Sequence, residues 1–110
     1  MTKTEIRNLV EKDIREYRYV PPSGTFLGVP FSEHKMNAQL EDLRRHLREP
    51  LLVPFSDGAS RWIVTQTDQN GYFVFFDEDS SDYGLGIVDY EGKPEDINVH
   101  GNLVGTYAAR

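Results

Sequence analysis

The chain contains no cysteine among its 110 residues, so disulfide bonds and thiolate metal sites are excluded. This absence fits a reducing compartment, and we expect a cytoplasmic protein. Residues 1–10 carry charged and apolar side chains at helical spacing. A secretory signal has a continuous apolar stretch instead, so we expect none here.

Long hydrophobic runs are also missing. The longest are residues 51–53 and 72–76. A membrane-spanning helix needs roughly 20 apolar residues, so we expect no membrane insertion. A chain of this length suffices for one domain, residues 1–110, and can bury about two thirds of its unfolded surface without covalent cross-links.

Positive charge is scarce in the second part of the chain. Residues 51–110 contain three Lys or Arg and ten Asp or Glu, a net charge of −7, whereas residues 1–50 contain nine and eight, a net charge of +1. An acidic surface repels phosphate backbones and attracts basic groups. We therefore expect no nucleic-acid partner and a protein partner of basic character.

Two helices are predicted before residue 50. Residues 2–19 place apolar side chains at helical spacing, Thr2 and Glu5 have capping-box spacing, and a pair of prolines follows the end. Residues 32–49 repeat the pattern, with Ser32 as the N-cap and a proline at position 50 as the stop.

The segment 20–31 between these helices is rich in proline and glycine, so it cannot form a long regular element. It also contains four large apolar residues, which is unusual for a solvated linker. We predict an ordered loop that lays these side chains over the core.

From residue 51 onward the spacing of apolar residues changes to two, which is typical of strands. The predicted strands are 51–55, 62–67, 72–76, 85–90, 97–100 and 103–107. Asn70-Gly71 is predicted to supply the positive φ angles of the hairpin turn before residue 72. The predicted fold class is α+β: two N-terminal helices packed on an antiparallel β-meander of about four to six strands, in a single two-layer domain.

The strand 72–76 is apolar on both faces, with two phenylalanines on one face and Tyr72, Val74 and Phe76 on the other. A two-layer fold covers only one face of its sheet. The second face therefore needs a cover, for which we consider the 20–31 loop, the first helix, strong curvature of the sheet, or another chain.

Catalytic and metal-binding signatures are missing. The acidic run 77–82 lacks the Gly and Glu that a calcium loop needs at its sixth and twelfth positions. His34, His46 and His100 do not have metal-ligand spacing, and Gly84-Leu85-Gly86 precedes no helix that could bind phosphate. We expect no metal, no cofactor and a non-enzymatic role, while a catalytic domain of unfamiliar type stays open.

Binding is the function that the composition favours. The segment 61–84 combines aromatic residues with concentrated negative charge, a combination suited to a basic protein partner. Our leading hypothesis is a small acidic interaction domain, with an inhibitor or immunity-type protein as its most concrete form. The predicted partner-binding residues are Trp62, Asp77, Glu78, Asp79, Asp82 and Tyr83.

Two alternatives come from other functional classes. The first is a small-molecule-binding or catalytic domain with a pocket between the first helix, the 20–31 loop and the sheet, lined by Tyr17, Phe26, Phe31 and His34. The second is a homodimer in which a partner chain covers the second face of the strand 72–76.

Overall fold

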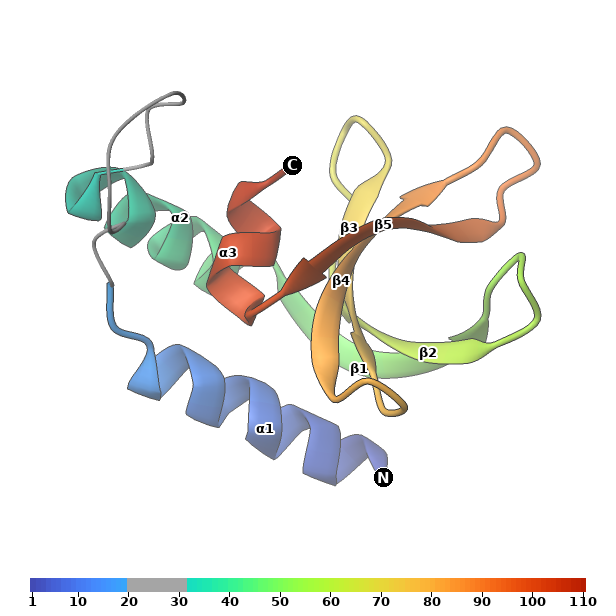
Figure 1. Ribbon diagram of the computed structural model, residues 1–110, viewed down its shortest axis with the longest axis horizontal. Coiled ribbons are helices and arrows are strands. Elements are labelled where there is room, and N and C mark those ends of the chain that lie inside the picture. Colours follow the sequence, from blue (N-terminus) through green and yellow to red (C-terminus); the bar gives the residue numbers. More distant parts are fainter. Residues whose placement is uncertain (20–31) are drawn as a thin grey trace.

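The computed structural model describes residues 1–19 and 32–110. Within these residues the chain forms three helices and an antiparallel sheet of five strands (Figure 1). In chain order the elements are α1 (Lys3–Glu16), α2 (Glu33–Arg45), β1 (Leu47–Pro54), β2 (Ser60–Thr65), β3 (Tyr72–Asp77), β4 (Asp82–Val88), β5 (Pro94–Gly101) and α3 (Leu103–Ala108). The predicted α+β class with an antiparallel sheet is confirmed. None of the helices among these residues is long and apolar enough to cross a membrane.

Helix α1 begins where its capping residues predict. The Thr2 side chain accepts a hydrogen bond from the Glu5 amide at 3.2 Å, and the Glu5 carboxylate accepts one from the Thr2 amide at 2.8 Å. This reciprocal pair satisfies two backbone donors at the start of the helix. The apolar stripe, Ile6, Val10 and Ile14, is buried. The helix ends at Glu16, three residues before the predicted end.

Helix α2 begins at the predicted cap, because the Ser32 side chain accepts from the Lys35 amide at 3.2 Å. Its predicted end at residue 49 is wrong. The helix stops at Arg45, and Leu47 already pairs with Thr65 as part of β1. Pro50 therefore lies inside an edge strand, in the interval between Leu47 and Leu51 where the register shifts. An irregular position tolerates proline because its ring nitrogen has no hydrogen to donate to the ladder.

The sheet is a simple meander, β1-β2-β3-β4-β5, in which each strand pairs with its neighbours in sequence. Two predictions within it need correction. Only Gly71 adopts a positive φ in the turn before β3, at 88°, and Asn70 does not. Residues 103–107 form helix α3, not a strand, because Asn102 caps its first turn by accepting from the Gly105 amide at 2.7 Å. The fold thus has a third helix, which follows β5 along the chain.

The larger core lies between the sheet and the helices. It combines the buried stripes of α1 and α2 with the inward face of α3 and the even-numbered residues Trp62, Val64, Val74 and Phe76 of β2 and β3. Figure 1 shows the three helices gathered on one side of the sheet.

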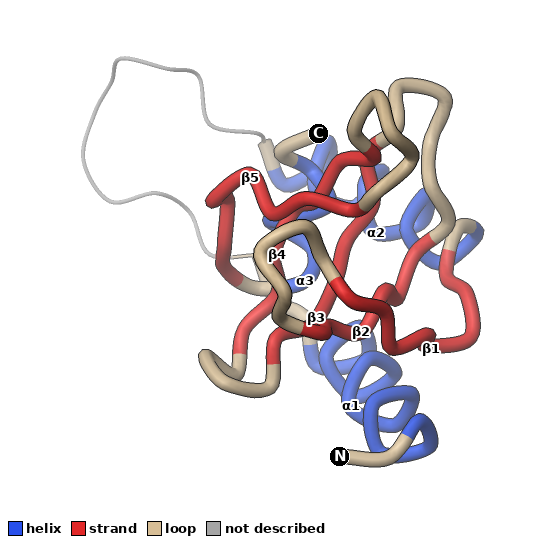
Figure 2. The backbone as a smooth tube through the Cα atoms, turned by 90° about the vertical axis from the view of Figure 1, so that its right-hand side faces the viewer, coloured by secondary structure: helices blue, strands red, loops and turns tan. Residues whose placement is uncertain are grey.

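A second, smaller core fills the opposite face of the sheet. Phe55, Phe73 and Phe75 are at most 5% exposed. Phe55 packs edge-to-face on the other two, with its ring centroid 5.0 Å from that of Phe75. In Figure 2 the strands curl around this face. The curl brings the two outer hairpins together, and the Ser56 amide donates to the Pro94 carbonyl at 3.0 Å. Of the covers considered for β3, sheet curvature is the one found within residues 1–19 and 32–110, and the 20–31 loop lies outside the described residues.

Two glycines in β4 permit the close packing of these rings. Gly84 lies opposite Phe75 and Gly86 lies opposite Phe73 in the β3–β4 ladder. A Cβ on Gly84 would lie 2.3 Å from the Phe75 ring, and one on Gly86 would lie 2.4 Å from the Phe73 ring. The Gly-Leu-Gly sequence of β4 is thus a platform for the two phenylalanines.

We predict that Gly84→Ala lowers the free energy of unfolding by about 1–3 kcal/mol, because the new methyl group overpacks a filled core. Gly101→Ala in β5 is the matched control, since its Cβ would meet only the Thr106 hydroxyl, at 3.8 Å. That variant should change stability by less than about 0.5 kcal/mol. Urea unfolding followed by Trp62 fluorescence measures both, and equal losses would contradict the platform role.

Candidate functional site

The structure divides the six predicted partner-binding residues into core and surface. Trp62 is 9% exposed and Tyr83 is 4% exposed, and both belong to the core that faces the helices. Their polar atoms are also engaged: the Trp62 Nε1 donates to Glu78 at 3.1 Å, and the Tyr83 hydroxyl donates to Asp13 at 2.6 Å. Neither ring offers a surface to a partner. The two rings instead hold the sheet against α1 and the β3–β4 turn.

The four predicted acids surround the turn between β3 and β4. Asp77 and Asp82 pair across the end of the two strands, while Glu78 and Asp79 lie in the exposed turn. Glu78 contacts the amino group of Met1 at 2.7 Å. We refer to Glu78 and Asp79 as the acidic turn.

Arg61 on β2 is a cation on the concave face of the sheet, which is the face that carries Phe73 and Phe75. Its guanidinium makes a two-point contact with Asp57, at 3.0 and 2.8 Å, and its Nε lies 3.5 Å from Asp77. The same guanidinium lies over the rings of Phe55 and Phe75, 4.8 and 5.6 Å from their centroids. Hydrogen bonding to Arg61 lowers the pKa of Asp57 to about 2. Charge pairing and cation–π contact thus converge on one side chain.

His100 on β5 extends this charged group toward the other edge of the sheet. Its Nε2 lies 3.0 Å from the Asp96 carboxylate, its Nδ1 lies 3.3 Å from Asp82, and its ring packs against Phe75. Partial burial lowers the pKa of His100, but the carboxylates of Asp96 and Asp82 outweigh that effect and raise it. The cations and carboxylates form one acidic cluster: Asp57, Arg61, Asp77, Asp82, Asp96 and His100.

Many aspartates of the sheet also stabilise turns. The side chains of Asp57, Asp68, Asp77, Asp89 and Asp96 each accept a hydrogen bond from a backbone amide two residues later. Such Asx turns satisfy backbone donors that the strands leave unpaired. Half of the ten acids in residues 51–110 therefore have a folding role that does not depend on a partner. The acids outside this group are Glu78, Asp79, Asp82, Glu91 and Glu95.

The alternative pocket near α1 is described only in part. Tyr17 lines a hollow of about 460 Å³ together with Asp13 and Tyr83. His34 lies exposed in the first turn of α2 and is not among the residues of this hollow. Phe26 and Phe31 lie outside the described residues, and so does the loop predicted for residues 20–31.

The sequence reasoning missed Arg61 and His100 as members of the site. One signal was available for Arg61, because it is one of three cations in residues 51–110. It also lies two residues before Ile63 in the same strand, so both side chains point to the concave face. His100 had no comparable signal, because its contact with Asp82 depends on the β4–β5 register and its contact with Asp96 depends on a register shift in β5.

Comparisons with protein-family models, with curated proteins and with solved structures found no match for this chain. Within residues 1–19 and 32–110, no three His, Asp or Glu side chains are arranged to hold a metal ion. Function is therefore inferred from the geometry of the described residues.

We predict that Arg61→Ala lowers the free energy of unfolding by about 2–3 kcal/mol, because it leaves Asp77 without its cation and uncovers Phe55. Lys93→Ala removes another cation of the sheet, one whose side chain is 64% exposed and whose partner Glu91 lies in a turn. This control should change stability by less than about 0.5 kcal/mol. Chemical denaturation distinguishes the two, and a silent Arg61→Ala would show that the cluster is not structural.

His100 should make stability depend on pH. A pKa raised on folding means that the protonated ring is favoured in the folded state. This stabilisation is complete below the unfolded pKa of about 6.5 and is lost as the pH rises through the folded pKa. We expect the free energy of unfolding to fall between pH 6 and pH 8.5. His100→Gln should reduce this fall, and the exposed His34→Gln should leave it as it is. The Met1 amino group, whose pKa is raised by the hydrogen bond to Glu78, accounts for the part that remains toward the alkaline end. An unchanged pH profile in His100→Gln would contradict the assignment.

Proposed function

We propose that this protein is a non-enzymatic interaction domain that binds a basic protein partner through the acidic cluster and the acidic turn. An inhibitor or immunity-type protein is the most concrete form of this proposal. The observation that supports it is the excess of carboxylates on one end of the curled sheet. The acidic cluster and the acidic turn together hold six carboxylates against Arg61, His100 and the Met1 amino group.

The carboxylates are positioned to contact a partner as well as the cations Arg61 and His100. The side chains of Asp57, Glu78 and Asp82 are 53%, 40% and 33% exposed. Backbone hydrogen bonds hold Asp57 and Asp77 in place, so a partner meets charges that are already ordered. Preorganised charges cost less conformational entropy on binding than mobile ones. Lysine or arginine side chains of the partner are the groups that match this surface.

The buried rings change the physical character of the interface from the one first predicted. Trp62 and Tyr83 supply no hydrophobic anchor, so binding relies on charge. Interfaces of this kind gain mainly in association rate, and the rate falls as salt screens the attraction. The proposal therefore predicts a fast, salt-sensitive association.

The test is affinity capture with the whole chain as bait, followed by association kinetics with each captured protein. Replacing the four predicted acids by their amides (Asp77→Asn, Glu78→Gln, Asp79→Asn and Asp82→Asn) keeps the Asp77 turn acceptor and removes four charges. We expect the association rate with a basic partner to fall by about tenfold at low salt.

A matched control removes the same charge from the helices. Glu11, Glu16, Glu33 and Glu41 are exposed, and their replacement by Gln should leave association unchanged. If the sheet variant still bound every captured protein at the wild-type rate, or if both variants slowed equally, the acidic cluster would not be the interface.

A further inference from the structure

A second hollow lies on the helix side of the molecule, away from the acidic cluster. It is an open hollow of about 660 Å³ between α2, the end of α3 and the segment that connects β2 to β3. Strands β2 and β3 pair only at Trp62–Phe76 and Ile63–Phe75, and the Thr65 hydroxyl then accepts from the Val74 amide. Beyond Thr65 the chain leaves β3, and the Gln66 amide donates to the His46 carbonyl at the end of α2. The segment 66–70, which follows this point, forms one wall of the hollow.

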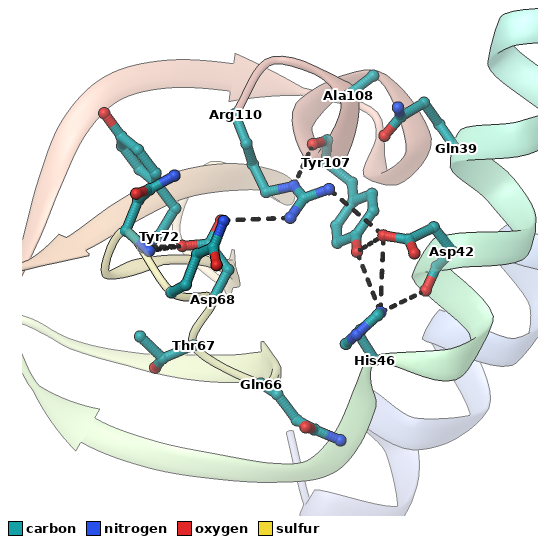
Figure 3. Close-up of a pocket in the computed structure, with 12 residues that line it drawn as sticks. Gln39, Asp42, His46, Gln66, Thr67, Asp68, Tyr72, Tyr107, Ala108 and Arg110 are labelled. Atoms are coloured by element: carbon teal, nitrogen blue, oxygen red, sulfur yellow. Dashed lines mark hydrogen bonds and ion pairs between the residues drawn. The ribbon is translucent and has the colours of Figure 1, made fainter.

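The charged groups in this hollow are already paired. Arg110 lies 3.8 Å from the centre of the Tyr107 ring and contacts Asp42 and Asp68 at 3.4 and 3.2 Å (Figure 3). Asp42 also accepts from the Tyr107 hydroxyl and from Arg45. The other oxygen of Asp68 accepts from the backbone amides of Asn70 and Tyr72. Every carboxylate oxygen in the hollow therefore has a donor.

The neutral polar side chains in the hollow, in contrast, have no hydrogen-bond partner among the described residues, and all of them except Gln39 are exposed to solvent. These side chains are Gln39, Gln66, Thr67, Gln69 and Asn70. Figure 3 shows Gln39 on α2 beside Ala108, and Gln66 and Thr67 on the segment that follows β2. Primary amides and a hydroxyl each donate and accept, which is the chemistry that recognises hydroxyl groups.

His46 adds a ring nitrogen. Its Nδ1 lies 2.8 Å from the Asp42 carbonyl oxygen. A carbonyl only accepts, so Nδ1 carries a hydrogen and Nε2 is the ring nitrogen left to contact a ligand. In Figure 3 the ring extends away from Asp42 toward the side of Gln66.

From these features we propose that the hollow binds an uncharged, polyhydroxylated small molecule of the size of a mono- or disaccharide. The volume lies in the range of small-molecule sites. An anion would meet Asp42 and Asp68, and a cation would find their oxygens already occupied. A planar base would lack a stacking surface, because Arg110 covers one face of Tyr107 and the ring of Tyr72 points away from Arg110 in Figure 3.

The test uses the whole chain labelled with ¹⁵N, whose glutamine and asparagine side-chain amide signals report on the hollow directly. The probes are ribose, glucose, sucrose and maltose, with inorganic phosphate, choline and adenine as the charged and planar comparisons. We expect at least one sugar to shift the signals of Gln39 and Gln66 saturably, while the three comparison compounds do not.

Variants then locate the site. Gln39→Ala combined with Gln66→Ala should raise the Kd for that sugar by about tenfold, because two hydrogen bonds to the ligand are lost. Asn37→Ala, an exposed amide on the same helix, should leave the Kd unchanged. The proposal is overturned if no sugar gives a saturable shift, if phosphate, choline or adenine binds in the hollow instead, or if Asn37→Ala weakens binding as much as the double variant.

Discussion

Two phenylalanines that point away from the helices determine the shape of this protein. Phe73 and Phe75 are almost completely buried although no helix among the described residues covers their face. They are buried because the sheet curls over them, and the curl is allowed because β4 has Gly84 and Gly86 where the rings lie. The hydrogen bond from Ser56 to Pro94 then joins the two outer hairpins. Arg61, Asp77, Asp82 and His100 lie on this same face of neighbouring strands, and the register shift in β5 places Asp96 beside His100.

The negative charge of the sheet comes partly from aspartates that stabilise turns and partly from acids without that role. A count of charged residues in the sequence does not separate the two groups. Five aspartates accept backbone hydrogen bonds in turns or at the β5 irregularity, where Asp is favoured for its short acceptor side chain. Asparagine would provide the same acceptor without the charge. Arg61 offsets part of the cost by pairing with Asp57 and Asp77. The acidic turn and Asp82 add charge beyond this turn chemistry, which is why the partner proposal concentrates on them.

The elements that the sequence predicted well are those determined by local chemistry. The caps Thr2 and Ser32, the buried stripe of α1 and the order of the strands follow from neighbouring residues, and the structure has them. The strand predicted for residues 103–107 was a local error, since Asn102 caps α3. The wrong end of α2 has a distant cause. Leu47 fits the stripe of α2 equally well, but pairing with Thr65 draws it into β1.

The candidate site was predicted less completely than the fold. The acids of the β3–β4 turn were visible as a charge run, but burial of Trp62 and Tyr83 depends on packing against α1 and α3, which no local pattern shows. The polar hollow is formed by three segments that are separated by up to about 70 positions, from Gln39 to Arg110. His46, Asp42 and Tyr107 each have an ordinary sequence context. Only the tertiary fold brings them together.

The two proposed binding surfaces are separated by the buried residues of β3. The β2–β3 connection borders the hollow and the β3–β4 turn carries the acids, so the two lie at opposite ends of β3. Between them Phe73, Val74, Phe75 and Phe76 are buried. Substitutions at well-separated sites without shared partners usually have additive effects. Amide replacements at the acidic turn should therefore leave sugar binding intact, and alanines at Gln39 and Gln66 should leave partner association intact. Loss of both functions in either variant would indicate unfolding of the shared core rather than damage to a site.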